Sequence, residues 1–388
     1  MRYSKLHLVS RQVHGMFFLT ASLVFVSCAP SHHSGAAECV GATMQQAEVK
    51  ADKAAYELYR REMALRPATA ADWQSRIALL ERIINLDPTF APALAALGDA
   101  HMQYASKTGG GAHHYEQAET FLRRALDIND ESPPTLLTLG SLYAKIGKSE
   151  ESAALLQRAL RKFPHSASFH QTLGYVYRYA GLLDESIAAY RQAQTLDASY
   201  ANLIDSEEQI VKALIYKGDN RAALASHAKI AAYRAAANQP DDHKELFYAG
   251  VSHLYLKDHT AAARLFDRAA AIDAASIWSV FAQAYKAAAQ GDRARLVEQV
   301  KKLETLDIVD SERRYRLAHF YALAGDRTAA LHNLRKAIEG GFFNYPYISR
   351  DPLLADINGT NEFKTLLREA KRRHEIFKRK FGARRERS

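Results

Sequence analysis

The sequence has few cysteines and few prolines. Only 2 of its 388 residues are Cys and only 10 are Pro. Two cysteines exclude a disulfide-stapled scaffold and a zinc site of the four-cysteine type. The scarcity of proline, together with the many Ala, Leu, Arg and Glu residues, favours helices over a β-sandwich. The apolar stretch 16–27 is shorter than the roughly 18 residues that an ordinary membrane-spanning helix needs.

Catalytic signatures are also missing. The sequence contains no G-x-S-x-G, G-x-x-x-x-G-K-[ST], G-x-G-x-x-G or H-E-x-x-H pattern. The glycine run 109–111 is not followed by Lys-Ser or Lys-Thr, so we expect a flexible loop there. His113 and His114 are adjacent, and adjacent side chains diverge on a helix or strand, which favours a solvated pair over a metal site. We therefore predict a protein that is not an enzyme and has no cofactor and no metal.

The first residues are typical of a secretory signal. Three basic residues precede an uncharged stretch, 16–27, of about a dozen residues, which suits a signal peptide better than a membrane span. The stretch ends in Phe25-Val26-Ser27-Cys28, which resembles the lipobox of bacterial lipoproteins. That resemblance implies a signal peptide and lipobox over residues 1–28 and lipidation of Cys28. The alternatives are ordinary cleavage near Ala37 and a retained anchor.

The residues after the lipobox predict a location. Ala29 is not aspartate, and by resemblance to lipoprotein sorting in two-membrane bacteria this favours the outer membrane. Residues 29–44 are mostly small and polar, which predicts a flexible tether. We expect an exported, membrane-anchored lipoprotein on the periplasmic face of the outer membrane.

Most of the remaining chain repeats with a period of about 34 residues. The segment from Thr138 to Gly147 resembles the segment from Thr172 to Gly181, and Gly250, Ala284 and Ala318 follow one another at the same spacing. The steps from Gly98 to Gly140 and from Glu208 to Gly250 are longer by eight residues, which fits an enlarged loop in each. Seven units follow, with starts near residues 91, 133, 167, 201, 243, 277 and 311.

The repeated positions resemble the tetratricopeptide repeat family. One unit matches its pattern with Leu139, Gly140, Tyr143, Gly147, Leu156, Ala159, Leu160 and Pro164. The resemblance implies an all-α fold, an α-solenoid in which helix-turn-helix units stack as a right-handed superhelix. We expect a degenerate leading helical pair at 45–90, seven units at 91–341, and C-terminal capping helices with a basic tail at 342–388. This ending resembles the repeat-containing halves of bacterial transcription regulators and kinases.

The first helix of each unit lines the concave side in such an array. Positions three before the small residue, and one, four and five after it, share a helix face and should point inward. They predict a partner groove made of Gln171, Tyr175, Arg178, Tyr179, Phe247, Leu254, Tyr255, Phe281, Tyr285, Tyr315 and His319. Aromatic and arginine side chains commonly carry binding energy. The alternative is that these rings pack between neighbouring first helices.

The C-terminal end is strongly basic. From residue 363 to 388 there are eleven basic and three acidic residues, a net charge of +8, whereas the whole chain carries +9. The candidate residues in this tail are Lys371, Arg372, Arg373, Lys378, Arg379 and Lys380. They predict either a solvated helix face or attraction to an anionic lipid surface or an acidic partner.

The leading hypothesis is a protein–protein interaction scaffold without enzymatic activity. It would be exported and lipid-anchored, would bind an unidentified protein or peptide in the aromatic groove, and would act in cell-envelope assembly. Its contact with a membrane would be the lipid anchor, and nucleic acid is not expected as a partner. The alternative is a regulatory or nucleic-acid-associated repeat protein that uses the basic tail. Export would separate the protein from chromosomal DNA and so favours the scaffold.

Overall fold

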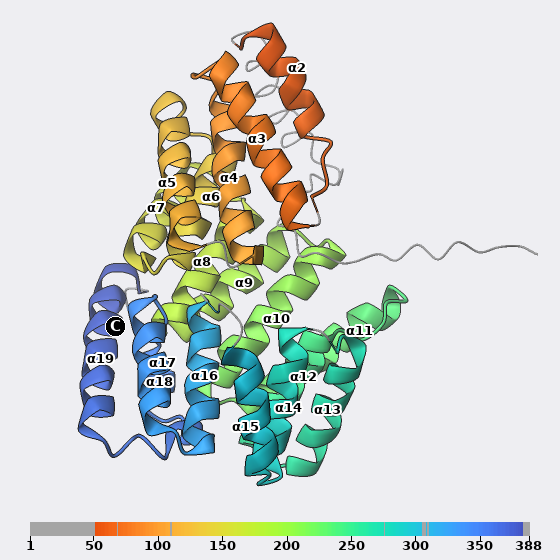
Figure 1. Cartoon of the computed structure of the whole chain (residues 1–388), viewed down its shortest axis with the longest axis vertical. Coiled ribbons are helices and arrows are strands. Elements are labelled where there is room, and N and C mark those ends of the chain that lie inside the picture. The colour runs from red at the N-terminus through yellow and green to blue at the C-terminus, as the bar shows by residue number, and fades with distance from the viewer. Residues whose placement is uncertain are drawn as a thin grey trace, which may run out of the picture.

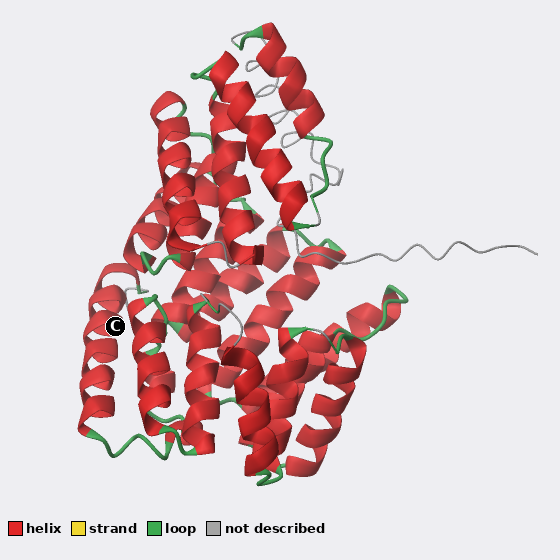
Figure 2. Cartoon of the chain, in the orientation of Figure 1, coloured by secondary structure: helices red, strands yellow, loops and turns green. Residues whose placement is uncertain are grey.

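The protein is all-α in the computed structural model, which confirms the predicted fold class. The structure describes residues 51–67, 69–108, 111–274, 276–304, 308 and 310–382, and these form 18 α-helices and one 3-10 helix, with no strand among them (Figure 1, Figure 2). None of the helices in these ranges is both long and apolar enough to cross a bilayer. The predicted signal peptide, Cys28 and the tether lie outside the described residues.

Consecutive helices pack as pairs, and the pairs stack in chain order (Figure 1). The leading pair is α2 (Lys53–Glu62) with α3 (Ala70–Leu86). The next seven pairs are α4 (Ala91–Thr108) with α5 (Gly111–Ile128), α6 (Pro133–Lys145) with α7 (Ser149–Lys162), α8 (Ala167–Ala180) with α9 (Leu183–Leu196), α10 (Tyr200–Lys217) with α11 (Asn220–Ala236), α12 (His243–Tyr255) with α13 (His259–Ile272), α14 (Ile277–Ala289) with α15 (Arg293–Glu304), and α16 (Ser311–Ala324) with α17 (Arg327–Glu339). The chain ends with α18 (Tyr345–Ile348), the 3-10 helix η1 (Pro352–Leu354) and α19 (Asn361–Phe381).

A recurring Gly-Asp dipeptide forms the turn inside several pairs. Gly325 has a φ of 80° and ends α16, since a left-handed residue stops a helix and glycine adopts that conformation without a steric penalty. The next residue, Asp326, accepts a hydrogen bond from the backbone N–H of Ala329 at 2.9 Å and so caps α17. Gly218 and Asp219 make the same turn between α10 and α11. Two residues therefore end one helix and start the next.

The small residue in the middle of each first helix lets the two helices of a pair approach closely. A Cβ on Gly174 would lie 2.9 Å from the ring of Tyr190 in the second helix, and a Cβ on Gly250 would lie 2.6 Å from the ring of Phe266. Both distances are shorter than van der Waals contact, so a larger residue would push the helices apart. Tyr190 follows Gly174 at the same spacing at which Phe266 follows Gly250, which shows that the crossing repeats.

The array coils so tightly that its late units contact its early ones. Gly341, after α17, packs against Gly147 in the turn between α6 and α7, where an added Cβ on either glycine would lie 2.8 Å from the other segment. α19 packs against α7 and α8 as well as against α17. Buried residues from Leu136 to Phe377 accordingly form one hydrophobic cluster, whereas an ideal solenoid buries surface only between neighbouring units.

Candidate functional site

The structure buries most of the predicted partner groove. The buried residues are Arg178, Tyr179, Phe247, Leu254, Phe281, Tyr285, Tyr315 and His319, while Gln171, Tyr175 and Tyr255 are partly exposed. The prediction of an open aromatic groove is therefore wrong for eight of the eleven residues. A partner-binding role stays a prediction for the three that are partly exposed. Alanine substitutions at Tyr179 and Tyr285 would remove core packing, so they would destabilise the fold rather than report on binding alone.

The concave side is filled because α16 lies inside the coil. A helix at the end of an open array would keep one face in water, but α16 is buried on most sides. Its buried residues are Ser311, Glu312, Tyr315, Arg316, Leu317, Ala318, His319, Phe320, Ala322 and Ala324. The N-cap residue of α16, Asp310, accepts a hydrogen bond from Tyr179 in α8 at 3.2 Å. The start of α16 therefore covers the part of the inner face where α8 carries Tyr179.

Glu312 is the centre of a buried charge network that joins four units. Its Oε1 accepts a hydrogen bond from Arg178 Nη1 at 2.6 Å and another from the hydroxyl of Tyr216. Arg316 lies 3.9 Å from the same oxygen and donates to the hydroxyl of Tyr248 at 3.1 Å. Burial alone would raise the pKa of Glu312, but the positive charges of Arg178, Lys212 and Arg316 outweigh it and lower the pKa to about 2. Glu312 is therefore held as a carboxylate.

Asp351 makes a second set of contacts that close the coil. It lies in the segment between α17 and α19, residues 342–360, which we call the C-terminal segment. Its carboxylate accepts hydrogen bonds from Tyr315 and His319 at 2.8 Å each and from Tyr255 at 3.1 Å. These three donors all come from the predicted groove. A carboxylate only accepts, so Nε2 of His319 donates to it, and in the neutral ring Nδ1 accepts from Tyr285 at 2.7 Å. The C-terminal segment thus occupies the side of the inner helices that an open groove would expose.

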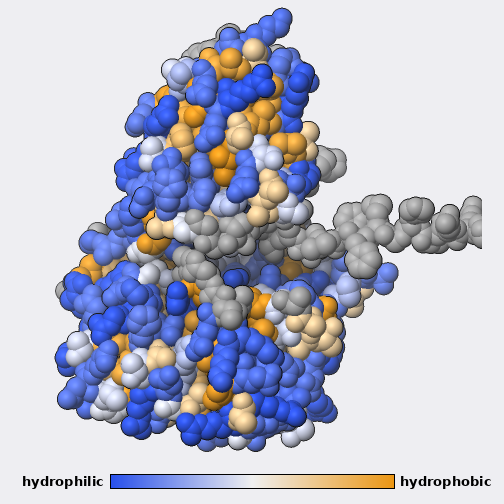
Figure 3. All heavy atoms as spheres, viewed as in Figure 1, coloured by the Kyte–Doolittle hydropathy of each residue, from blue (hydrophilic) through white to orange (hydrophobic). Residues whose placement is uncertain are grey.

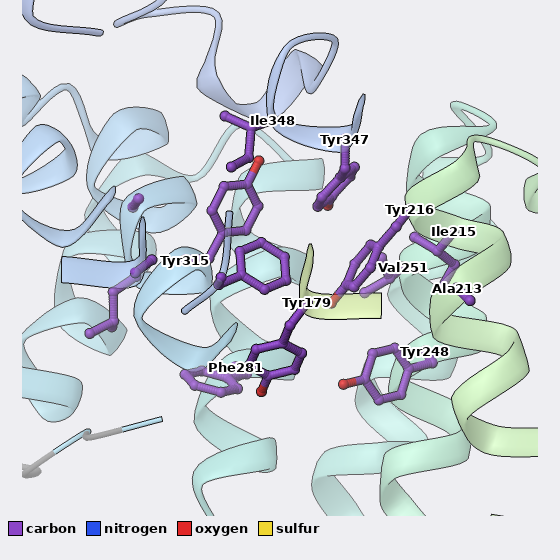
Figure 4. Close-up of a cluster of buried hydrophobic side chains, with 14 of the residues drawn as sticks. Tyr179, Ala213, Ile215, Tyr216, Tyr248, Val251, Phe281, Tyr315, Tyr347 and Ile348 are labelled. Carbon is purple, nitrogen blue, oxygen red and sulfur yellow. The ribbon is translucent and has the colours of Figure 1, made fainter. Parts of the chain in front are cut away.

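Aromatic rings fill the space around these polar contacts. Figure 4 shows Tyr216, Tyr315 and Tyr347 gathered between the inner helices and the C-terminal segment. The rings of Tyr216 and Tyr347 stack at 4.4 Å between centroids, and Phe342 lies 4.9 Å from Tyr315. Aromatic pairs at these distances stabilise the fold by more than the burial of their surface area alone would. This half of the inner face is therefore part of the hydrophobic core.

The inner face stays open along the early units. More than half of the residues at the same inward offsets are exposed or partly exposed on α4, α6, α8 and α10. We call six of them the inner row: Asp99, Gln103, Lys145, Gln171, Tyr175 and Lys212. Desolvation lowers the pKa of Lys145 and the charge of Arg313 adds to this effect, while the charges of Asp310 and Asp99 oppose it. The sequence analysis did not identify Asp99, Gln103, Lys145 and Lys212, because the offsets were applied only to units with aromatic residues at these positions. The same offsets in the other units would have found them.

The other candidates from the sequence lie elsewhere. His114 does not pair with His113 but with His101 of α4, whose Nδ1 lies 2.8 Å from its own Nδ1. Burial lowers the pKa of His101 to about 4, and the charges of His114 and His113 add to this effect. Among the described residues there is no group of three or more His, Cys, Asp or Glu that could hold a metal ion. Of the basic-tail residues, only Arg373 packs inward; the other five are exposed.

Part of the chain matches models of known repeats. Residues 111–174 and 167–200 each match a model of the tetratricopeptide repeat. The matched stretch covers α5 to α9, and helix pairs of the same kind continue on both sides of it. The chain therefore contains tetratricopeptide repeats and folds as a stacked array of such units.

Sequence comparison finds two relatives of different kinds. The chain is 26% identical over 118 residues to anaphase-promoting complex subunit 3 of Schizosaccharomyces pombe, a match that covers 30% of this chain and 16% of that protein. It is 31% identical over 112 residues to interferon-induced protein with tetratricopeptide repeats 2 of Mus musculus, covering 28% of this chain and 22% of that protein. The chain thus spans about a fifth or less of either relative, and the similarity is one of repeats.

Solved structures of repeat proteins resemble the array more broadly. The crystal structure of PilW, a type IV pilus biogenesis factor, aligns with a TM-score of 0.49 and 15% identity, covering 59% of this chain and 98% of that one. A tetratricopeptide repeat protein from Parabacteroides merdae aligns with a TM-score of 0.45 and 13% identity, covering 72% of this chain and 98% of that one.

Proposed function

We propose that this protein is a scaffold that binds another protein or peptide through the inner row and has no enzymatic activity. The observation that carries the proposal is the contrast between the two halves of the inner face. On α12, α14 and α16 most of the residues at the inward offsets are buried, whereas on α4 to α10 more than half of them are exposed or partly exposed, and the inner row carries charged, amide and phenol side chains. A strip of exposed polar and aromatic side chains along successive helices suits an extended peptide.

The inner row offers two kinds of contact. Gln103 and Gln171 carry amide oxygens that can accept from a peptide backbone, while their Nε2 atoms donate within the chain, to Asp99 and to Asn202 and Ser206 respectively. Tyr175 supplies an aromatic surface that is backed by Tyr179, whose ring centroid lies 4.3 Å away. Because the closed half of the coil holds Tyr179 in place, Tyr175 loses little freedom on binding, and such a residue can contribute roughly 2 kcal/mol or more to affinity.

A substitution in the inner row is expected to weaken partner capture without unfolding the chain. A photo-crosslinking residue at Lys145 would first identify the partner in cells. The double variant Gln103→Ala/Lys145→Ala should then raise the Kd for that partner at least tenfold, because Lys145 is exposed and Gln103 is partly exposed. The matched control is Gln299→Ala/Lys301→Ala on α15, which should leave the Kd unchanged. Equal Kd values for the two double variants would contradict the inner row as the binding site.

We further propose that the protein is exported and anchored by lipid on Cys28, with a role in cell-envelope assembly. The support is in the sequence, where basic residues, a short apolar stretch and the Ser27-Cys28 junction follow one another. Each buried CH₂ of an acyl chain contributes about 0.8 kcal/mol to membrane binding, so several chains on one residue would hold the protein firmly. The periplasmic face of the outer membrane is the location that Ala29 favours.

Replacing Cys28 by alanine should release the protein from the membrane fraction or block its maturation. The reason is that the lipid and the signal-peptide cleavage both depend on this thiol. Cell fractionation and the mass of the mature chain measure the two effects. The control is Cys39→Ala, which removes the other cysteine and should change neither. A Cys28→Ala protein that keeps its wild-type mass and fractionation would refute the anchor.

A further inference from the structure

The outer face of α19 presents a row of exposed basic side chains. We call this row the basic stripe, and it consists of Lys364, Arg368, Lys371, Arg372, Lys378 and Arg379. α19 lies at the outer edge of the molecule, on the side away from the leading helices, and that edge is mostly hydrophilic (Figure 1, Figure 3). The stripe therefore faces solvent along its length.

Helical geometry puts the six cations on one face. With 3.6 residues per turn, successive residues turn by about 100°, and the six positions fall within an arc of about 120°. The one carboxylate inside that arc is Glu375. The stripe thus carries five net positive charges, and from Lys364 to Arg379 it is about 22 Å long at about 1.5 Å per residue.

The opposite face of α19 is fixed in the core. Its buried residues are Phe363, Leu366, Ala370, His374 and Phe377. Nδ1 of His374 lies 2.7 Å from the carbonyl oxygen of Ala180, and Arg373 donates to the carbonyl of Ile338 at the end of α17. The helix cannot turn its apolar face outward without losing these contacts. Anything that binds the stripe must therefore be held by charge and not by insertion of apolar side chains.

The stripe is less neutralised than the cations around it. Arg335 pairs with Glu362 at 2.7 Å, and Lys380 pairs with Glu150. Within the part of the chain that the structure describes, no carboxylate forms an ion pair with five stripe residues, Lys364, Arg368, Lys371, Lys378 and Arg379. Arg372 alone is paired, with Glu369. A helix face that only kept the protein soluble would not need a row of unpaired cations next to cations that are paired with carboxylates.

We propose that the basic stripe binds the surface of an anionic lipid bilayer. A straight row of long, flexible cations on a convex helix is complementary to a flat surface with diffuse negative charge, and clusters of four to eight Lys or Arg are typical of such contacts. The proposal rests on the proposed function only in that the Cys28 anchor would hold the chain next to a membrane. The contact orients the array against the membrane and leaves the inner row free for a partner.

Vesicle binding by the full chain tests the proposal. The measurement is co-sedimentation with phosphatidylcholine vesicles in which about a third of the lipid is phosphatidylglycerol, compared with phosphatidylcholine alone, at low and at high salt. The stripe variant is Lys364→Gln/Arg368→Gln/Lys371→Gln/Lys378→Gln. We expect the wild type to prefer the anionic vesicles at least tenfold at low salt, the preference to vanish at high salt, and the stripe variant to lose most of it.

A matched variant tests whether binding depends on the position of the basic stripe or only on the net charge of the protein. Arg82→Gln/Arg158→Gln/Arg191→Gln/Lys301→Gln removes four exposed cations from α3, α7, α9 and α15. It should keep the preference of the wild type, and circular dichroism should show both variants folded. Equal loss in the two variants, or no preference in the wild type, overturns the proposal. So does binding of a short DNA duplex that the stripe variant loses while vesicle binding persists. The N-terminal segment is identical throughout, so these results do not depend on lipidation or on the partner.

Discussion

Glu312→Gln is expected to lower the free energy of unfolding by about 3–5 kcal/mol at pH 7. The substitution keeps the shape of the side chain but removes the carboxylate that faces Arg178, Arg316 and Lys212. Arg178 and Arg316 are 0% and 3% exposed, so they would stay buried as unpaired charges. Urea unfolding followed by circular dichroism measures the loss.

The effect should depend on pH in a defined direction. The folded-state pKa of Glu312 is about 2, below the ordinary value of 4.5, so its ionisation stabilises the fold above pH 4.5. That stabilisation is lost as pH falls from 4.5 towards 2, and the wild type and Glu312→Gln should converge there. The control is Glu339→Gln, since Glu339 is exposed and should change stability by less than about 0.5 kcal/mol. A constant difference between wild type and Glu312→Gln from pH 7 to pH 3 would show that charge is not the cause.

The order of the helices could be predicted because it is encoded locally. The small residues, the Gly-Asp turns and the repeat period all act within one unit, and the seven first helices begin at residues 91, 133, 167, 200, 243, 277 and 311. These starts lie within one residue of those expected from the period. The unit that has Glu207 and Glu208 at the usual Leu-Gly positions also forms its helix pair.

The closure of the coil could not be predicted from the same signals. Arg178 and Glu312 are 134 residues apart, and Tyr255 and Asp351 are 96 apart, so their contacts depend on small rotations summed over several units. No motif in the sequence indicates the total rotation that accumulates over these units. The offset rule selects side chains on one helix face, but it did not indicate that α16 and the C-terminal segment would cover them.

Asp351→Ala should be the most damaging single change in the C-terminal segment, with a loss of about 3–5 kcal/mol in the free energy of unfolding. The variant would leave the hydroxyl of Tyr315 and the Nε2 of His319 without their buried acceptor, and the hydroxyl of Tyr255 would keep only the Tyr347 hydroxyl as a partner. Buried polar groups without partners cost about 1–3 kcal/mol each, and part of this cost returns if water enters the site. Thermal melting and limited proteolysis within 342–360 measure the global and the local effect.

Two further variants determine what kind of contact Asp351 makes. Asp351→Asn keeps one acceptor oxygen, so some of the three donors stay satisfied. Its free energy of unfolding should therefore fall less than that of Asp351→Ala. Asp356→Ala removes an exposed carboxylate that pairs with Arg327 at 2.9 Å and should cost less than about 1 kcal/mol. If Asp351→Ala melted like Asp356→Ala, the C-terminal segment would be held by its aromatic and aliphatic packing alone. If it melted far lower and its C-terminal segment became protease-sensitive, Asp351 would be the residue that keeps the inner face of the late units closed.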